Sequence, residues 1–175
     1  MRNSGAEQDA LYEQAAAAYG LAMERLARAY EPDPDKRRDL VQDIHVALWR
    51  SFARFAGRAS LRTWVYRVAH NTAISQITRR RAGAPSLVSL DHLEAVHIVD
   101  DSTRDIDRRL ALERLLALIR TLAPLDRQVI LLYLEDLDAQ SIADIVGTSP
   151  GNVATKVHRI KQILSRRFHG VIADA

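Results

Sequence analysis

The sequence contains no cysteine among its 175 residues. This absence excludes a disulfide framework, thiolate metal sites and a cysteine nucleophile, and it agrees with a reducing compartment. No apolar run approaches the roughly 18 residues that a bilayer-spanning helix needs, and the N-terminus lacks a basic start followed by an apolar core. We therefore expect a soluble, cytoplasmic protein that does not insert into a membrane.

Strand patterns are nearly absent as well. Runs that alternate apolar and polar residues between turn signals are not found, whereas apolar residues recur at helical spacing along most of the chain. Hydrophobic residues make up 47% and charged residues 27% of the composition, a balance typical of a globular protein. The sequence therefore predicts an all-α fold.

The few proline and glycine residues mark breaks between the predicted helices. A first helical unit is predicted over residues 9–81. Within it, Pro32 and Pro34 of the stretch EPDPD end one helix, and Asp39 lies near the start of the next. Ser60 is expected to N-cap a third helix.

A change of composition separates this unit from a second one. Residues 82–106 are rich in acids and serine, include Gly83 and Pro85, and show no sustained periodicity, which is typical of a flexible linker. Helical spacing dominates again in residues 107–169. We predict two small helical domains joined by an acidic linker.

The stretch IADIVGTSPGNVATKVHRI predicts a helix-turn-helix pair. Gly147 suits the left-handed residue that ends a helix, Ser149 suits an N-cap, and Pro150 then falls at the first position of the next helix. The second helix has one apolar stripe, formed by Val153, Val157, Ile160 and Leu164. Two helices that cross at such a tight turn are the geometry of a DNA-binding pair, although a glycine turn also occurs in ordinary helical hairpins.

Charge favours DNA binding by this segment. No Asp or Glu occurs from Ile145 to Ala173, whereas five basic residues do: Lys156, Arg159, Lys161, Arg166 and Arg167. A solvated helix face normally mixes both signs, so this bias indicates phosphate contact.

A second acid-free stretch runs from Arg50 to Gly83 and carries eight arginines. Within it, Leu61, Trp64, Val65 and Val68 have core spacing, and both Trp49 and Trp64 are expected in the core. Another face is formed by Tyr66, Arg67, His70 and Asn71. An aromatic ring among Arg and Asn side chains can stack on an unpaired base, which suits single-stranded nucleic acid. The alternative is that Tyr66 borders the core and His70 is a polar residue whose hydrogen bonds are satisfied within the protein.

The segments DLVQDIHVALWRSF, SLRTWVYRVAHN and SIADIVGTSPGNVATKVHRIKQIL, with an acidic linker before the last, resemble bacterial RNA polymerase sigma factors of the extracytoplasmic-function (ECF) type. Such proteins keep only regions 2 and 4 of the sigma-70 family. The resemblance covers residues 10–168. It implies a monomeric promoter-recognition subunit that binds core RNA polymerase and promoter DNA, with no catalysis, cofactor or metal. Many relatives are held inactive by an anti-sigma factor.

The resemblance also implies site residues. The helix that matches DLVQDIHVALW docks on the polymerase largest subunit in this family, which implies polymerase contacts at Asp39, Gln42 and Asp43. The loop and helix that match FAGRASLRTWVYRVAHN hold the melted minus-ten element, which implies contacts from Arg58, Ser60, Arg62, Tyr66, Arg67, His70 and Asn71. The last helix pair reads the minus-thirty-five element, with contacts from Ser149, Asn152, Thr155, Lys156 and Arg159.

The stretch DKRRD departs from the family, because relatives commonly carry acids just before the polymerase-binding helix. Lys36, Arg37 and Arg38 stand there instead.

The length of the linker gives a further expectation. A relaxed coil over residues 82–106 spans roughly 25–30 Å, whereas two turns of DNA span about 70 Å. We therefore expect a compact free protein that opens when it is bound to polymerase and promoter.

Three other functions compete with this interpretation. An ordinary helix-turn-helix regulator would need a dimer interface or a ligand domain, and it would leave the acid-free stretch from Arg50 unexplained. An enzyme could use a cluster in the linker, formed by Asp91, Glu94, His92 and His97, but that cluster lacks a second group of ligands. A protein adaptor would show little salt-dependent DNA binding.

Overall fold

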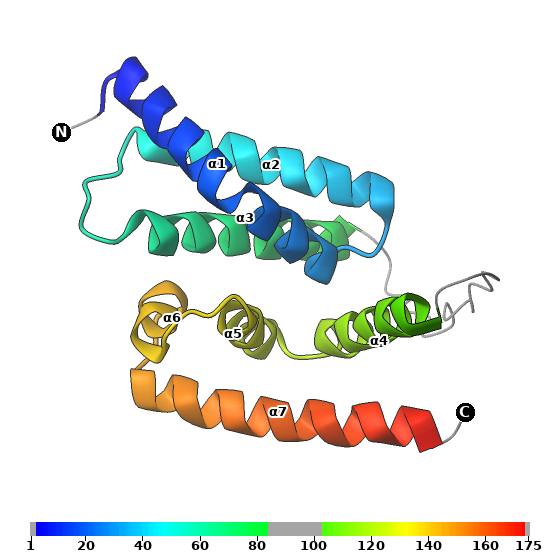
Figure 1. Cartoon of the computed structure of the whole chain (residues 1–175). Helices are drawn as coiled ribbons and strands as arrows, with labels where there is room; N and C mark the ends of the chain where they lie inside the picture. The colour runs from blue at the N-terminus through cyan, green and yellow to red at the C-terminus, as the bar shows by residue number, and fades with distance from the viewer. Residues whose placement is uncertain (1–2, 84–102, 174–175) are drawn as a thin grey trace.

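The computed structural model describes residues 3–83 and 103–173, and within these ranges every regular element is a helix, which confirms the all-α prediction. The helices form three layers, with α1 to α3 above, α4 to α6 in the middle and α7 below (Figure 1). Their bounds are α1 Gly5–Tyr30, α2 Pro34–Phe52, α3 Leu61–Gly83, α4 Thr103–Arg120, α5 Pro124–Leu134, α6 Ala139–Val146 and α7 Pro150–Ala173. No helix in these ranges is long and apolar enough to cross a membrane.

Helix α1 begins four residues before the predicted start of the first unit. Ser4 is its N-cap: the Ser4 hydroxyl accepts the Glu7 N–H, and the Glu7 carboxylate accepts the Ser4 N–H at 2.8 Å. This reciprocal pair satisfies two backbone donors that a helix start otherwise leaves free. The spacing Ser4 to Glu7 was the available signal in the sequence.

Helix α1 ends at Tyr30, as predicted for the helix before Pro32 and Pro34, but the prediction that the next helix starts near Asp39 is wrong, because α2 begins at Pro34. Asp33 is the N-cap, and its carboxylate accepts the N–H groups of Asp35 and Lys36 at 2.9 and 3.1 Å. Proline is well tolerated at the first helical position, where its missing N–H costs no hydrogen bond. The helix therefore starts five residues before Asp39.

The first helical bundle packs α2 and α3 against α1. Leu40, Ile44, Leu48 and Phe52 of α2 are fully buried at 0% exposure, so truncating one of the leucines to alanine would cost about 2–5 kcal/mol. The predicted core position of Trp49 is wrong: its ring is 41% exposed, and its Nε1 donates to Asp9 at 2.8 Å.

The buried surface of α3 is wider than the predicted core face. Of the four expected core residues, Val65 is buried, and Leu61, Trp64 and Val68 are half-buried and pack against the core. The remaining buried residues of this face are Thr63, Tyr66, Ala69, His70, Ala73 and Gln76. Helix α3 contacts α1 and α2 on one side and the second bundle on the other. A helix packed on two sides buries residues that a single-stripe pattern assigns to solvent.

The second bundle contains the predicted helix-turn-helix pair, α6 and α7. Gly147 ends α6 in the left-handed conformation, at φ 76° and ψ 45°. The Ser149 hydroxyl accepts the Asn152 N–H at 3.3 Å, and α7 begins at Pro150. The four residues of the predicted apolar stripe of α7 are all buried: Val153, Val157, Ile160 and Leu164. The local prediction is thus confirmed at the turn, the cap and the core face.

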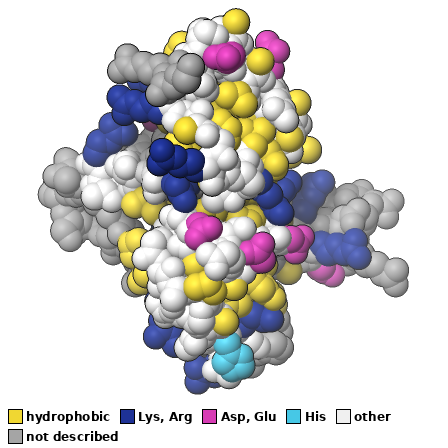
Figure 2. All heavy atoms as spheres, turned by 90° about the vertical axis from the view of Figure 1, so that its left-hand side faces the viewer, with side chains coloured by type: hydrophobic (Ala, Val, Ile, Leu, Met, Phe, Trp, Pro, Cys, Tyr) yellow, Lys and Arg dark blue, Asp and Glu magenta, His cyan; other side chains and the backbone are white. Residues whose placement is uncertain are grey.

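The two bundles lie against each other. Helix α1 contacts α4, and α3 contacts α5 and α6. In the view of Figure 2, basic side chains of the upper bundle come close to acidic side chains of the lower one. The two helices that flank the predicted linker, residues 82–106, extend into it: α3 ends at Gly83, and α4 begins at Thr103.

Candidate nucleic-acid interfaces

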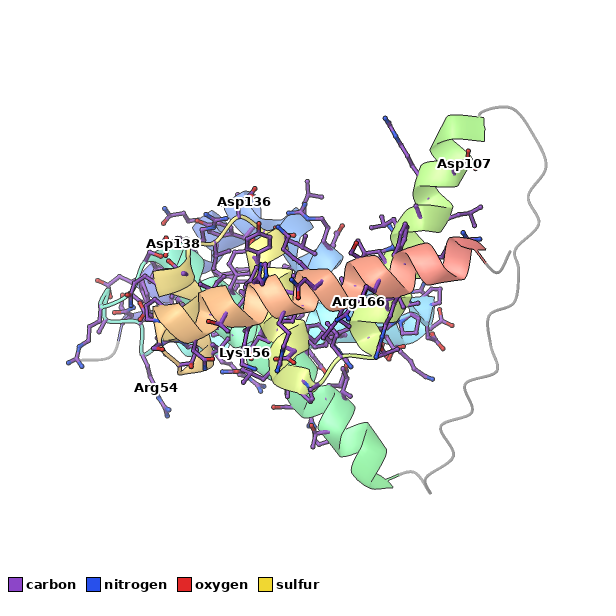
Figure 3. All side chains as sticks on the ribbon, turned by 90° about the horizontal axis from the view of Figure 1, so that it is seen from below. Arg54, Asp107, Asp136, Asp138, Lys156 and Arg166 are labelled. Atoms are coloured by element: carbon purple, nitrogen blue, oxygen red, sulfur yellow. The ribbon has the colours of Figure 1, made fainter. Side chains whose placement is uncertain are left out.

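The first turns of α7 present the predicted duplex-reading residues to solvent. Ser149, Asn152 and Thr155 are all exposed. The Asn152 amide donates to the Thr148 hydroxyl at 2.7 Å, and the Thr155 hydroxyl donates to the Gly151 carbonyl at 3.0 Å. Helix α7 forms the outer layer, and Figure 3 shows it crossing the underside of the molecule. No domain covers this face in the part of the chain that the structure describes.

Lys156 and Arg159, also on α7, share one carboxylate from another helix. Lys156 Nζ lies 2.7 Å from Asp126 Oδ1, and Arg159 Nη2 lies 3.0 Å from Asp126 Oδ2. The Lys156 side chain is only 19% exposed, whereas that of Arg159 is 58% exposed. Arg159 therefore remains available to a DNA phosphate, and Lys156 must leave Asp126 to reach a base. This carboxylate comes from α5, so the charge pattern of the acid-free stretch does not predict it.

The loop before α3 exposes two of the predicted minus-ten residues, Arg58 and Ser60, and α3 itself exposes Asn71. Ser60 is the predicted N-cap, since its hydroxyl accepts the Thr63 N–H at 3.1 Å. Asn71 faces solvent on a helix that contains no Asp or Glu.

His70 does not lie on the solvent face with Asn71. Its ring is 1% exposed, its Nδ1 is 3.0 Å from the Tyr30 hydroxyl, and the two rings meet edge to face at 5.6 Å between centroids. Burial lowers the pKa of His70 to about 3, because the charged imidazolium would lose its hydration. His70 is thus a hydrogen-bonded polar residue, as in the alternative interpretation, and it is too buried in this structure to contact DNA.

Three other predicted minus-ten residues point at the second bundle. The Tyr66 hydroxyl donates to Glu135 Oε2 at 3.0 Å, Arg62 donates to the main-chain oxygen of Glu135, and Arg67 Nη2 donates to the Asp144 carbonyl at 2.7 Å. Burial, followed by the nearby Glu135 charge, raises the pKa of Tyr66 to about 12. The side of α3 that carries Arg62, Tyr66 and Arg67, here called the α3 face, is thus covered by the turn after α5 and by α6.

The predicted polymerase-binding residues lie on the outer face of α2. Asp39, Gln42 and Asp43 are exposed, and the Asp43 carboxylate accepts the Gln76 amide at 3.0 Å. Sequence reasoning missed two apolar residues on the same helix, Val46 and Trp49, each 41% exposed. The spacing Asp39, Gln42, Val46 and Trp49 places all four on one stripe. Exposed apolar side chains between polar ones are typical of an interface.

The basic stretch before α2 has a different setting. Arg37 and Arg38 line an open hollow of about 720 Å³ between α1, α2 and α4, together with Arg25, Arg28 and Glu113. Lys36 and Arg38 pair with Asp33 and Asp35 of their own turn. The described residues contain no group of three or more His, Asp or Glu side chains that could hold a metal. The alternative cluster around His92 and His97 lies outside the described residues.

Two family matches cover most of this architecture. Sigma-70 region 2 matches residues 16–83, which are α3, α2 and most of α1. Sigma-70, region 4 matches residues 112–164, from within α4 to within α7. The two regions in this order define a protein of the sigma-70 family.

Similar proteins narrow the class. The RNA polymerase sigma-E factor of Streptomyces avermitilis is 30% identical over 158 residues, 88% of this chain and 83% of the relative. The RNA polymerase sigma factor YlaC of Bacillus subtilis is 28% identical over 75% of this chain and 76% of its own length. The ECF RNA polymerase sigma factor SigG of Mycobacterium tuberculosis is 30% identical over 72% of this chain, which spans only 40% of that relative. The chain belongs to the ECF sigma factors of the sigma-70 family.

Solved structures share the fold. CnrH in complex with the cytosolic domain of CnrY aligns with a TM-score of 0.66 at 23% identity, over 94% of this chain and 89% of that one. The sigma factor RpoE in complex with the anti-sigma factor NepR, from Bartonella quintana, aligns with a TM-score of 0.67 at 21% identity, over 89% of this chain and 94% of that one. At these identities the likeness concerns the arrangement of helices.

Proposed function

We propose that this protein is a promoter-recognition subunit of bacterial RNA polymerase. It binds the core enzyme, reads duplex DNA at the minus-thirty-five element with α7, and holds unpaired bases of the minus-ten element with α3 and the preceding loop. It makes and breaks no bond itself. The observation that carries this proposal is the open face of α7, where exposed Asn152 and Thr155 lie on a helix that carries no carboxylate from its start to Ala173.

The duplex contact divides between two kinds of side chain. Asn152 and Thr155 end in groups that donate and accept, as reading a base edge in the major groove requires. Arg159 is one turn further along, and its guanidinium supplies a charge for a backbone phosphate. Ser149 at the helix start and Lys156, after release from Asp126, complete the proposed surface.

The single-strand contact uses the α3 face and the loop before it. Asn71, Arg58 and Ser60 are exposed in the free protein. Three further contacts become available only when the second bundle moves away, because they are engaged by it: Arg62, Tyr66 and Arg67. Tyr66 would then offer a ring for base stacking, with arginines beside it for phosphates.

The polymerase contact uses the outer stripe of α2. Asp39, Gln42 and Asp43 supply polar groups to a basic partner surface, and the exposed Val46 and Trp49 add apolar area. Aromatic residues in such a position commonly contribute much of the binding free energy. We propose that the protein acts in the cytoplasm as a monomer until it binds core enzyme.

We further propose that an anti-sigma protein controls this subunit. Two solved relatives were captured with partners, CnrH with the cytosolic domain of CnrY and RpoE with the anti-sigma factor NepR. These complexes support a partner of the same kind here.

Runoff transcription tests the proposed function. Core RNA polymerase and a set of promoter templates are combined with and without the purified chain. We expect a discrete transcript only when the chain, the core enzyme and a matching promoter are all present. An ordinary helix-turn-helix regulator would bind duplex DNA but give no transcript with core enzyme, and a protein adaptor would show no salt-dependent DNA binding. Either result would contradict the proposal.

A further inference from the structure

The carboxylate of Glu135 sits among donors that come from the other bundle. Arg25 of α1 donates to it twice, from Nε to Oε1 at 2.8 Å and from Nη2 to Oε2 at 2.6 Å. The Tyr66 hydroxyl donates to Oε2 at 3.0 Å. The Glu135 side chain is 19% exposed, whereas that of Arg25 is 59% exposed. One anionic group therefore fills a small site built from α1 and α3.

The turn that carries Glu135 is fixed in place. The Glu135 N–H donates to the Leu131 and Leu132 carbonyls, each at 3.2 Å. Leu137, two residues after Glu135, is buried at 6% exposure. Between them Asp136 adopts the left-handed region at φ 56°, which residues other than glycine adopt infrequently. The turn presents Glu135 to the first bundle as a rigid unit.

The donors of this site, the Arg25 guanidinium and the Tyr66 hydroxyl, also suit a phosphate group. A guanidinium that donates two parallel bonds matches either a carboxylate or a phosphodiester, because each offers two oxygens that share one negative charge. Both neighbouring arginines of α3 also end on oxygens of the second bundle, Arg62 on the Glu135 carbonyl and Arg67 on the Asp144 carbonyl. Acceptors of the second bundle thus take the place that nucleic-acid oxygens would occupy on the α3 face.

We propose that Arg25 and Tyr66 form a binding site for a backbone phosphate of single-stranded nucleic acid, and that Glu135 occupies this site in the free protein. The inference rests on the proposed single-strand contact of α3 and extends it to α1. Separation of the bundles withdraws the carboxylate and frees Arg25, so the strand and the second bundle compete for the same donors. Arg25 then neutralises one phosphate and releases the counterion that accompanied it.

The test measures the affinity of a fluorescent single-stranded oligodeoxythymidylate for the full chain at several salt concentrations. Glu135→Ala empties the site, so we expect this variant to bind at least about threefold more tightly than the unmodified chain, because a larger fraction of molecules is open. Adding Arg25→Gln in the Glu135→Ala background removes the phosphate ligand. The slope of log affinity against log salt should then become shallower by about 0.7, the value for one phosphate of a single strand.

Arg28→Gln in the same background is the matched control. Arg28 also lies on α1 and pairs with a carboxylate of the second bundle, but this carboxylate is Glu113 of α4 rather than Glu135. We expect its salt slope to equal that of Glu135→Ala alone. Circular dichroism verifies that each variant is folded.

Two results would overturn the proposal. One is an equal affinity of Glu135→Ala and the unmodified chain, which would mean that Glu135 does not compete with the strand. The other is an equal salt slope for the Arg25→Gln and Arg28→Gln variants, which would make Arg25 only an ion-pair partner between bundles. Runoff transcription separates this outcome from the proposed function. If the chain supports promoter-directed transcription but gives either of these two results, only the proposed phosphate site is wrong, and the proposed function stands.

Discussion

The two helical bundles hold their candidate nucleic-acid faces in opposite states. On α7 of the second bundle, Asn152, Thr155 and Arg159 face solvent, and no other bundle covers them in the described part of the chain. On α3 of the first bundle, Tyr66 and the two arginines near it bond to the second bundle instead. The proposed duplex-reading face is thus exposed in the free protein, apart from Lys156 at its ion pair with Asp126, whereas the second bundle covers the proposed single-strand face.

This difference suits the order of events at a promoter. Duplex DNA is present from the start, but unpaired bases appear only after polymerase has engaged the promoter. A covered single-strand face avoids binding to other single-stranded nucleic acid before that point. The cover combines one ion pair, between Arg25 and Glu135, with the buried side chain of Tyr66, so separation of the bundles breaks polar contacts and exposes an aromatic ring.

The largest expected effect comes from holding the bundles together. Arg28→Cys combined with Glu113→Cys places two thiols at an ion pair between the bundles, in a chain without other cysteines. After reaction with a short bifunctional thiol reagent, we expect runoff transcription and single-strand binding to fall about a hundredfold, because the open form is no longer populated. Duplex binding should persist.

The same double variant without reagent is the control, and it should transcribe like the unmodified chain. Full transcription by the crosslinked protein would contradict the proposed difference between the two bundles, because it would mean that the protein is active while the α3 face stays covered.

Acid should affect the first bundle more than the second. His70 is buried with a pKa of about 3, below the ordinary value of 6.5, so the unfolded chain binds a proton that the folded chain does not. Its contribution is complete above about pH 6.5 and is lost as the pH falls toward 3, which amounts to about 3 kcal/mol at pH 4. Both tryptophans, Trp49 and Trp64, lie in the first bundle and report its unfolding by fluorescence.

The matched variant for this prediction is His70→Gln, which cannot titrate. Carboxylates contribute acid sensitivity to both proteins and cancel in the difference between them. We expect urea titrations at pH 7 and pH 4 to show a smaller loss of stability for the variant. An identical loss in the two proteins would mean that His70 is charged or solvated in the folded state.

If α7 reads bases, replacing a base-reading side chain should lower the affinity for the matching DNA sequence and leave the affinity for other sequences unchanged. We expect Asn152→Ala to weaken binding to the preferred duplex by about 1–3 kcal/mol and to change the sequence preference. Arg159→Ala should weaken all duplexes alike and reduce the salt slope by about one unit. Fluorescence anisotropy on matched and scrambled duplexes measures both. If the two variants lose affinity equally on every sequence, Asn152 does not read a base.

A smaller effect, about tenfold in the rate of open-complex formation, is expected for Asn71→Ala. Asn71 is exposed on α3 outside the part that the second bundle covers, and its amide can both donate to and accept from an unstacked base. Polymerase binding and duplex recognition should stay near normal, and a template unpaired across the minus-ten element should partly restore transcription. Permanganate footprinting beside a polymerase pull-down separates the steps. Melting equal to that of the unmodified protein would make Asn71 a structural residue.

Local chemistry made the second bundle predictable. Gly147, Ser149 and Pro150 each have a conformational preference that acts within a few residues, so the turn, the cap and the buried stripe of α7 followed from the sequence. The start of α1 was equally local, in the Ser4 to Glu7 pair, but was missed. Pro34 showed the ambiguity of proline, which can follow one helix or begin another.

The α3 face was not predictable in the same way. Tyr66 and His70 have helical spacing that fits either solvent or a second packing partner, and the partner for Tyr66 is Glu135, far along the chain. Asp126 is a similar case, since it reaches the basic residues of α7 from α5. Contacts between distant segments depend on how the helices pack, and a charge pattern along one helix does not contain them.

The most direct test of the account is the distance between the bundles in solution. Fluorescence energy transfer between dyes on Gln14→Cys of α1 and Gln162→Cys of α7 reports this distance, because both positions are exposed and the chain has no other thiol. We expect a short distance in the free protein and a longer one after core RNA polymerase and promoter DNA are added. An unchanged distance in the active complex would contradict the claim that the α3 face is uncovered by separation of the bundles.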